Sequence, residues 1–277
     1  MVEIVAFLYY NIFQRSVMVL LLAIDIGNTH ITMGAFEDDA LSFVSRIATD
    51  VRQTADQYAV TLLGILKLKK VDVKSIQCAI IGSVVPGLDS TLAAAVSETC
   101  HVSPLILGPG IKTGLNIRID NPAQLGADLV AGAVAAVAMF PMPCIILDLG
   151  TATKISVLDH TGAFLGCTIS AGPQISLDAL ATRTAQLPFI HLKAPRHVIG
   201  TNTIHSMQSG LLYGTAAMLD GVVERIEEEI GAKATLAATG GLSKPVIGNC
   251  RREMIHCENL ILEGLKIIYH KNQVMDC

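Results

Sequence analysis

Hydrophobic residues form short continuous runs separated by polar turns, and two of these runs share one organisation. The first covers residues 20–26, is apolar except for an acid near its end, and passes through a glycine turn into another apolar run. The second covers residues 144–159 and repeats the order of apolar strand, Asp-x-Gly, small hydroxyl residues and apolar strand. Two apolar runs joined by a short turn with glycine predict a β-hairpin. Such a repeat rarely arises by chance.

Around the hairpins, the pattern predicts alternating strands and helices. Continuous apolar runs indicate buried strands, and apolar residues at helical spacing indicate amphipathic helices. The pattern Thr54-x-x-Gln57 is a capping box, which predicts the start of a helix. The acidic stretch Glu224–Glu229 is expected to face solvent. The predicted strands are 41–48, 76–83, 104–107, 164–170 and one from 235 to 239; the predicted helices are 54–68, 88–98, 126–140, 176–184, 206–230 and 260–269; and 197–203 is predicted to be a loop.

The order of hairpin, strand, helix, strand and helix occurs twice, with a junction near residues 124–126. We therefore expect an α/β protein of two ribonuclease-H-like domains, whose mixed sheets flank a cleft lined by both hairpins. The N-terminal domain is placed at residues 18–124 and the C-terminal domain at 125–277. Residues 1–17 are interpreted as an extension outside the fold; the alternative is an added strand or a partner-binding segment.

The turns of the two hairpins have the chemistry of a phosphate site. Glycine lacks a Cβ, so the backbone at Gly27 and Gly150 can approach a ligand closely. Backbone N–H groups at such a turn can bind phosphate oxygens together with neighbouring hydroxyls and amides. The side chains available for this are Asn28, Thr29, Thr151 and Thr153.

An acid precedes each of these glycines by two positions, at Asp25 and Asp148. A carboxylate repels a phosphate, so its presence there makes sense if it holds a cation, directly or through water. Two such hairpins facing each other would bind a nucleotide polyphosphate and its metal. The alternative is that both are ordinary hairpins whose hydrophilic turns bind nothing, because short glycine motifs often occur without function.

Composition narrows the class of protein. Of the 277 residues, 51% are hydrophobic and 16% are charged, which is typical of a compact globular chain with apolar surface to spare for oligomerisation. The net charge is −4 without a basic run, so we expect no nucleic-acid partner. No run reaches the ~18 uncharged apolar residues of a membrane span, and no secretory signal is evident. Seven cysteines without Cys-x-x-Cys spacing favour a reducing cytoplasm.

An ordered set of short motifs resembles type III pantothenate kinase, a family in the actin, hexokinase and Hsp70 superfamily. The resemblance covers nearly everything from Met18 to about Tyr269. Each motif is weak alone, but their order is specific. The motifs are Asp25-Ile-Gly-Asn-Thr29, Ser83-Val-Val-Pro86, residues 108–117, Asn121-Pro122, Gly126-Ala-Asp128, Asp148-x-Gly-Thr-Ala-Thr153, Asn202-Thr203, residues 207–210 and Thr239-Gly-Gly241.

The resemblance implies the roles of the nucleotide-binding residues. ATP is the implied phosphate donor, with Mg²⁺ held through water by Asp25 and a monovalent cation, K⁺ or NH₄⁺, held by Asp148. The segment 239–241 would lie near the adenosine. The residues expected to contact ATP are Asp25, Gly27, Asn28, Thr29, His30, Thr32, Thr151, Thr153, Gly240 and Gly241.

The resemblance also implies pantothenate as the acceptor, Asp128 as the general base at its hydroxyl, and a homodimer with the acceptor pocket near the dimer interface. Three positions depart from the family's pattern: Leu129 replaces an arginine, Ile119 replaces a tyrosine, and Lys154 replaces a threonine. The first two fall in the expected acceptor pocket. The residues expected to contact pantothenate are Gly126, Ala127, Asp128, Leu129, Ile119 and Thr203.

Three functions are therefore open. The first is ATP-dependent phosphorylation of pantothenate, which begins coenzyme A synthesis. The second is a diverged kinase for another small alcohol, and the third is a non-catalytic nucleotide-binding regulator. Leu129 and Ile119 discriminate among them, because the first function needs other groups, such as Arg118 or Lys112, to replace the lost polar contacts.

Overall fold

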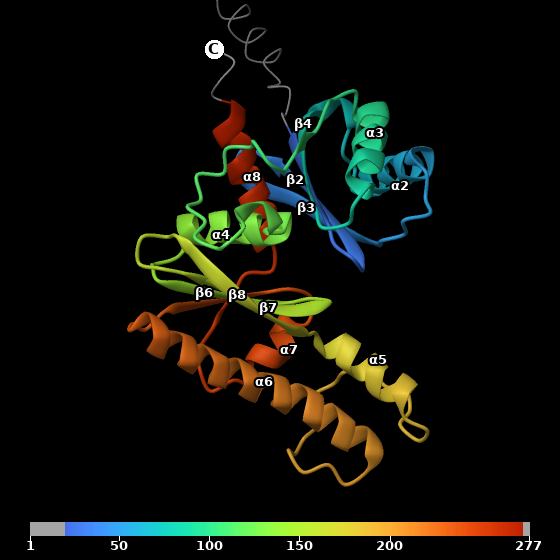
Figure 1. Ribbon diagram of the computed structural model, residues 1–277. Helices are drawn as coiled ribbons and strands as arrows, with labels where there is room; N and C mark the ends of the chain where they lie inside the picture. Colours follow the sequence, from blue (N-terminus) through green and yellow to red (C-terminus); the bar gives the residue numbers. More distant parts are fainter. Residues whose placement is uncertain (1–19, 274–277) are drawn as a thin grey trace, which may run out of the picture. The chain divides into compact units, whose positions relative to one another are not determined.

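The computed structural model describes residues 20–273, so the prediction for residues 1–17 lies outside the described part of the chain. Two compact units make up the described residues (Figure 1). The first contains residues 20–112 with 126–128 and 265–273, and the second contains 113–125 with 129–264. This grouping differs from the expected division after residue 124, because the chain returns to the first unit at its end. Leu265, for example, lies against Gly82.

The first unit contains a five-stranded mixed sheet in the order β3-β2-β1-β4-β5. β1 pairs with β2, and β2 with β3, in antiparallel fashion, whereas β1–β4 and β4–β5 are parallel. The predicted hairpin, the strands and the capped helix are confirmed, including both hydrogen bonds of the capping box between Thr54 and Gln57. The elements are β1 (Leu20–Ile26), β2 (His30–Glu37), β3 (Ala40–Ala48), α2 (Ala55–Leu68), a 3₁₀ turn (Val73–Ser75), β4 (Ile76–Ser83), α3 (Leu88–Cys100), β5 (Leu105–Ile106) and α8 (Leu260–Gln273).

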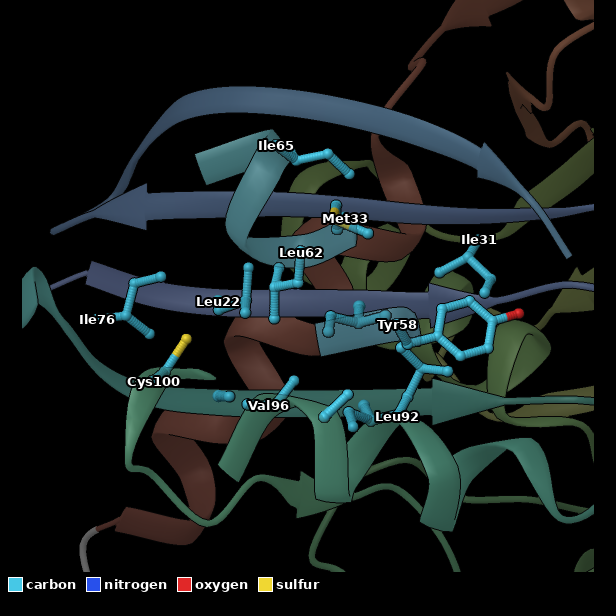
Figure 2. Close-up of a cluster of buried hydrophobic side chains, with 14 of the residues drawn as sticks. Leu22, Ile31, Met33, Tyr58, Leu62, Ile65, Ile76, Leu92, Val96 and Cys100 are labelled. Atoms are coloured by element: carbon cyan, nitrogen blue, oxygen red, sulfur yellow. The ribbon is translucent and has the colours of Figure 1, made fainter. Parts of the chain in front are cut away.

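The core of this unit lies between one face of the sheet and the helices α2 and α3 (Figure 2). Alternate residues of β1 point to this face because side chains along a strand alternate between its two sides. Leu22 and Met33 of the hairpin pack there with Leu62 of α2 and Val96 of α3. The hairpin that carries the first acid and glycine is thus fixed to a fully buried core.

The second unit repeats the topology of the first. Its sheet has the order β10-β9-β6-β7-β8, which read from β8 is the order of the first sheet, with two antiparallel pairs followed by two parallel ones. The predicted α/β fold with two mixed sheets is confirmed. The elements are a 3₁₀ turn (Pro122–Gln124), α4 (Ala127–Met139), β6 (Cys144–Leu149), β7 (Ala152–Leu158), β8 (Phe164–Ala171), α5 (Pro173–Arg183), α6 (Thr203–Ile230), β9 (Thr235–Thr239), α7 (Ser243–Ile247) and β10 (Ile255–His256).

Helices cover both faces of the second sheet. Ile145, Leu147 and Leu149 of β6 pack on the side of α6, whereas Cys144 and Ile146 pack with the alanines of α4 on the other side. Figure 1 shows the long helix α6 running along its face of the sheet. Because strand side chains alternate, Asp148 belongs to the same face of β6 as Ile146.

Three details differ from the sequence prediction. Glu227 was expected to face solvent but is only 4% exposed, because Arg252 and Lys233 pair with it. Thr203 was expected in a loop but is the first residue of α6, since Asn202 caps the helix through a hydrogen bond from the His205 N–H. The two-residue strand β10 was not expected, because so short a run has no detectable period.

No helix within residues 20–273 is long and apolar enough to cross a membrane.

Candidate functional site

The turn of the first hairpin joins β1 to β2 and carries exposed polar side chains. The N–H of Gly27 donates to the carbonyl of His30 at 3.0 Å, which closes the turn. Asn28, Thr29 and His30 are exposed there, and Asp25 is half-buried in the last part of β1, opposite Thr32 of β2. The structure therefore brings together the residues of the first hairpin that the sequence nominated for phosphate and metal.

Thr49 holds this turn from outside the hairpin. Its Oγ1 donates to the carbonyl of Gly27 at 2.7 Å, and its N–H donates to the carbonyl of Thr29 at 3.0 Å. These two hydrogen bonds occupy the carbonyl groups of Gly27 and Thr29 and hold the turn against the end of β3. Sequence reasoning did not single out Thr49, because a threonine directly after a strand carries no signal of a contact 22 residues away.

The turn of the second hairpin is similar. The N–H of Gly150 donates to the carbonyl of Ala152 at 3.2 Å, and the side chain of Thr151 is exposed. Gly172, at the end of β8, donates its N–H to the carbonyl of Thr151 at 3.1 Å. A Cβ on residue 172 would overlap the carbonyl oxygens of Gly150 and Thr151, so only glycine fits against this turn.

Asp148 and Lys154 form an ion pair across the second hairpin. They occupy directly opposed positions of β6 and β7. The Nζ atom of Lys154 lies 2.7 Å from Oδ2 of Asp148, and their side chains are 17% and 13% exposed. The sequence marked Lys154 as a departure from the family's pattern, and the structure shows what it contacts.

The glycine turn after β9 lies against the same carboxylate. Gly240 has a φ of +93°, in the left-handed region that favours glycine, and a Cβ there would lie 2.7 Å from Oδ1 of Asp148. Ser243 fixes the turn by donating its hydroxyl to the Gly240 carbonyl at 2.6 Å, and the His256 Nε2 lies 3.1 Å from the same hydroxyl oxygen. Gly241 is exposed. Sequence reasoning did not single out these contacts of Ser243 and His256.

Thr153 differs in position from the other nominated hydroxyls. It is opposite Leu149 in the hairpin, on the face of the sheet that packs against α6, and is 1% exposed. Its Oγ1 is buried and has no hydrogen-bond partner in the described structure. Thr151 is exposed and Thr153 is not, so the structure places these two hydroxyls in different environments.

Asp128, nominated as the general base, lies in the first turn of α4 and is half-buried. A Cβ on Gly126 would lie 2.7 Å from Oδ1 of Asp128, so glycine at this position avoids a clash with the carboxylate. Ala127 is half-buried beside them.

The remaining nominated acceptor residues belong to the second unit. Leu129 is half-buried in α4, Ile119 packs against the apolar cluster of α4 and β6, and Thr203 is exposed at the start of α6. The nominated residues are thus divided: the first hairpin and Gly126–Asp128 are in the first unit, and the second hairpin, the Gly240 turn and these three are in the second. That both sets act on one nucleotide and one acceptor stays a prediction.

The fold is shared with solved structures of low sequence identity. MreB5 of Spiroplasma citri bound to AMPPNP matches with a TM-score of 0.53 and 12% identity, covering 92% of this chain and 97% of that one. The activator of 2-hydroxyisocaproyl-CoA dehydratase from Clostridium difficile matches with a TM-score of 0.55 and 12% identity, covering 94% and 99%. Together with the repeated sheet and its two glycine hairpins, these matches define the class: an α/β protein with the fold of the actin and hexokinase superfamily.

Sequence relatives narrow the class to one family. The family model "Type III pantothenate kinase" matches residues 21–225. Type III pantothenate kinases of Halalkalibacterium halodurans and Shouchella clausii are 39% and 43% identical over 253 and 257 residues, covering 91% and 92% of this chain and all of each relative. The chain belongs to the type III pantothenate kinase family, as its motifs indicated.

Proposed function

We propose that this protein transfers the γ-phosphoryl group of ATP to the hydroxyl of pantothenate, the first step of coenzyme A synthesis. The observation that carries this proposal is similarity to type III pantothenate kinases along more than nine-tenths of the chain. Asp128, the nominated base, is present in the first turn of α4.

The chemistry asked of these residues is mostly positioning. Phosphoryl transfer needs the acceptor oxygen in line with the leaving oxygen, stabilisation of the phosphate charge, and a group that accepts the hydroxyl proton. We assign proton acceptance to Asp128 and phosphate binding to the exposed turns around Asn28 and Thr151. The hydroxyl oxygen bonds to the γ-phosphorus, its proton passes to Asp128, and ADP leaves with the electrons of the broken bond.

We assign Mg²⁺ to Asp25. Mg²⁺ is usually held by one or two carboxylates together with substrate phosphates and water, and a half-buried carboxylate beside a phosphate-binding turn fits this pattern. Among residues 20–273, no group of three or more His, Cys, Asp or Glu side chains could hold a metal ion. When bound, Mg²⁺ neutralises phosphate charge.

Two residues expected in the acceptor pocket favour a second candidate function. A charged hydrogen bond from arginine is worth about 1.5–3 kcal/mol, which Leu129 cannot supply. Ile119 packs with apolar neighbours and offers no hydrogen bond in place of the tyrosine. These two side chains favour, as the second candidate, a kinase for a less polar small alcohol on the same fold.

We further propose that the enzyme is a homodimer in the cytoplasm. β8 is an edge strand, and its Ile169 is 66% exposed. Phe189, in the segment after α5, is 70% exposed. Exposed apolar side chains on an edge strand are a liability that a second copy can cover. The buried thiols Cys100 and Cys144 suit a reducing compartment.

An ADP-release assay tests the main proposal. The purified full chain is incubated with ATP and Mg²⁺, with and without pantothenate. Release of ADP that depends on pantothenate, with phosphopantothenate identified by mass spectrometry, is the expected result. Nucleotide binding without pantothenate-dependent release would overturn pantothenate as the acceptor, and a panel of small alcohols would then test the second candidate.

A further inference from the structure

The ion pair of Lys154 with Asp148 bears on the cation that the family resemblance implies at this carboxylate. A monovalent cation would have to bind where an ammonium group already lies, 2.7 Å from Oδ2. The other oxygen, Oδ1, lies beside the Gly240 turn, where a Cβ on residue 240 would come within 2.7 Å of it. The ammonium group of Lys154 on Oδ2 therefore makes the site a poor fit for a bound K⁺ or NH₄⁺ on Asp148.

Electrostatic repulsion between the Lys154 ammonium and a second cation opposes binding of that cation at Asp148. Two unit charges about 4 Å apart repel by about 4 kcal/mol at the effective dielectric constant of a partly buried site. Asp148 and Lys154 are both mostly buried, so salt screens this repulsion only weakly. A repulsion of about 4 kcal/mol corresponds to roughly a thousandfold weaker binding of a second cation.

The lysine is not demanded by the hairpin itself. In the first hairpin, which has the same topology, Asp25 is opposite Thr32, the position that corresponds to Lys154 opposite Asp148. A threonine is thus compatible with the pairing, and the lysine is a particular feature of the second hairpin. Its ε-ammonium carries the charge and N–H donors that NH₄⁺ also has. Because it is covalently attached, its presence at the site does not depend on the concentration of a free ion.

We propose that the ε-ammonium of Lys154 takes the place of a bound monovalent cation at Asp148, so that phosphoryl transfer by this enzyme is independent of K⁺ and NH₄⁺. The proposal rests on the proposed function. Lys154 acts here as a positioning residue: it neutralises Asp148 and keeps the carboxylate oriented beside the Gly240 turn.

The test compares the full-length wild type with Lys154→Thr, which gives the second hairpin the pairing of the first. ADP release with ATP, Mg²⁺ and pantothenate is measured in choline chloride and, at equal ionic strength, in KCl or NH₄Cl. The wild type is expected to show the same rate in all salts. Lys154→Thr is expected to lose about tenfold or more in choline chloride and to recover in KCl and NH₄Cl. Lys67→Thr, on the exposed face of α2, is the control for the substitution.

A second readout does not need turnover. The midpoint of thermal unfolding is measured with a non-hydrolysable ATP analogue in the same salts. K⁺ should leave the wild type unchanged and raise the midpoint of Lys154→Thr, since a bound ion stabilises the folded state. Stimulation or stabilisation of the wild type by K⁺ would overturn the proposal, as would a Lys154→Thr variant that loses stability in every salt alike. Absence of ADP release from all variants would instead overturn the proposed function, while the unfolding data still decide this inference.

Discussion

Glu227 is a buried carboxylate surrounded by donors. Arg252 donates to both of its oxygens at 2.7 and 2.9 Å, Lys233 Nζ lies 2.7 Å from Oε2, and the Ala234 N–H donates to Oε1 at 3.1 Å. The hydrogen bonds from Arg252, followed by those of Lys233 and Ala234, hold the pKa of Glu227 at about 2, well below its usual range. This residue ties the end of α6 to the segments before β9 and β10.

Glu227→Gln is expected to lower the free energy of unfolding at neutral pH by about 3 kcal/mol, because Arg252 would lose its buried charged partner. The folded-state pKa is depressed, so the stabilising contribution is complete above the unfolded value of 4.5 and is lost as the pH falls toward about 2. Urea unfolding over this pH range should therefore show a steeper decline in the wild type than in the variant, which keeps the contributions of other carboxylates with a lowered pKa, such as Asp50 and Asp159. The exposed neighbour Glu228→Gln is the control, and an equal effect there would contradict the assignment.

Asp128 is a second single residue with a testable role, the acceptance of one proton from the substrate hydroxyl. Asp128→Asn keeps the shape of the side chain but removes its ability to accept a proton. We expect kcat to fall by about 10²–10⁴-fold while the affinity for ATP stays unchanged, measured by coupled ADP release and by calorimetric titration with an ATP analogue. Unchanged turnover in this variant would remove Asp128 from the mechanism.

At the scale of elements, the site depends on short turns held by distant residues. The first hairpin turn is fixed by Thr49, and the second by Gly172 and by the turn of Gly240. Each restraint comes from the end of another strand of the same sheet. Strand ends meet at one edge of a sheet, which is why residues far apart in sequence can shape one turn.

Thr49→Val tests this restraint, since valine keeps the shape of threonine and loses the hydroxyl. Losing one hydrogen bond of about 0.5–1.5 kcal/mol should raise KM for ATP about two- to tenfold, with little change in kcat. Thr49→Ser, which keeps the hydroxyl, should behave as the wild type. If the serine and valine variants are equally impaired, the hydroxyl is not what holds the turn.

At the scale of the whole molecule, two units share one sheet topology, and the exposed apolar residues concentrate in the second. Ile169, on the edge strand β8, is the residue we expect at a dimer interface. Ile169→Lys should shift the protein from dimer to monomer in sedimentation velocity, because a buried unpaired charge is costly. Val60→Lys, at a 72% exposed position of α2, should leave the oligomeric state unchanged. A wild type that sediments as a monomer would contradict the predicted homodimer.

The sequence by itself determined the repeated architecture and the kinase family. Continuous apolar runs ending in Asp-x-Gly predicted both hairpins, and the helical spacing with a capping box at Thr54 predicted α2. These features are local, so the pattern of residues is enough to reveal them. The order of the motifs pointed to the type III pantothenate kinases.

Only the tertiary structure decided which side chains meet. Glu227 lies in an acidic stretch that resembles a solvated helix face, and its burial follows from Arg252, 25 residues away. In the sequence, Lys154 is only a substitution in a motif. The antiparallel register of β6 and β7 places it opposite Asp148, where the two form an ion pair. Pairings of this kind depend on register and on chain returns that no local pattern encodes, because a one-residue slip would send each side chain to the other face.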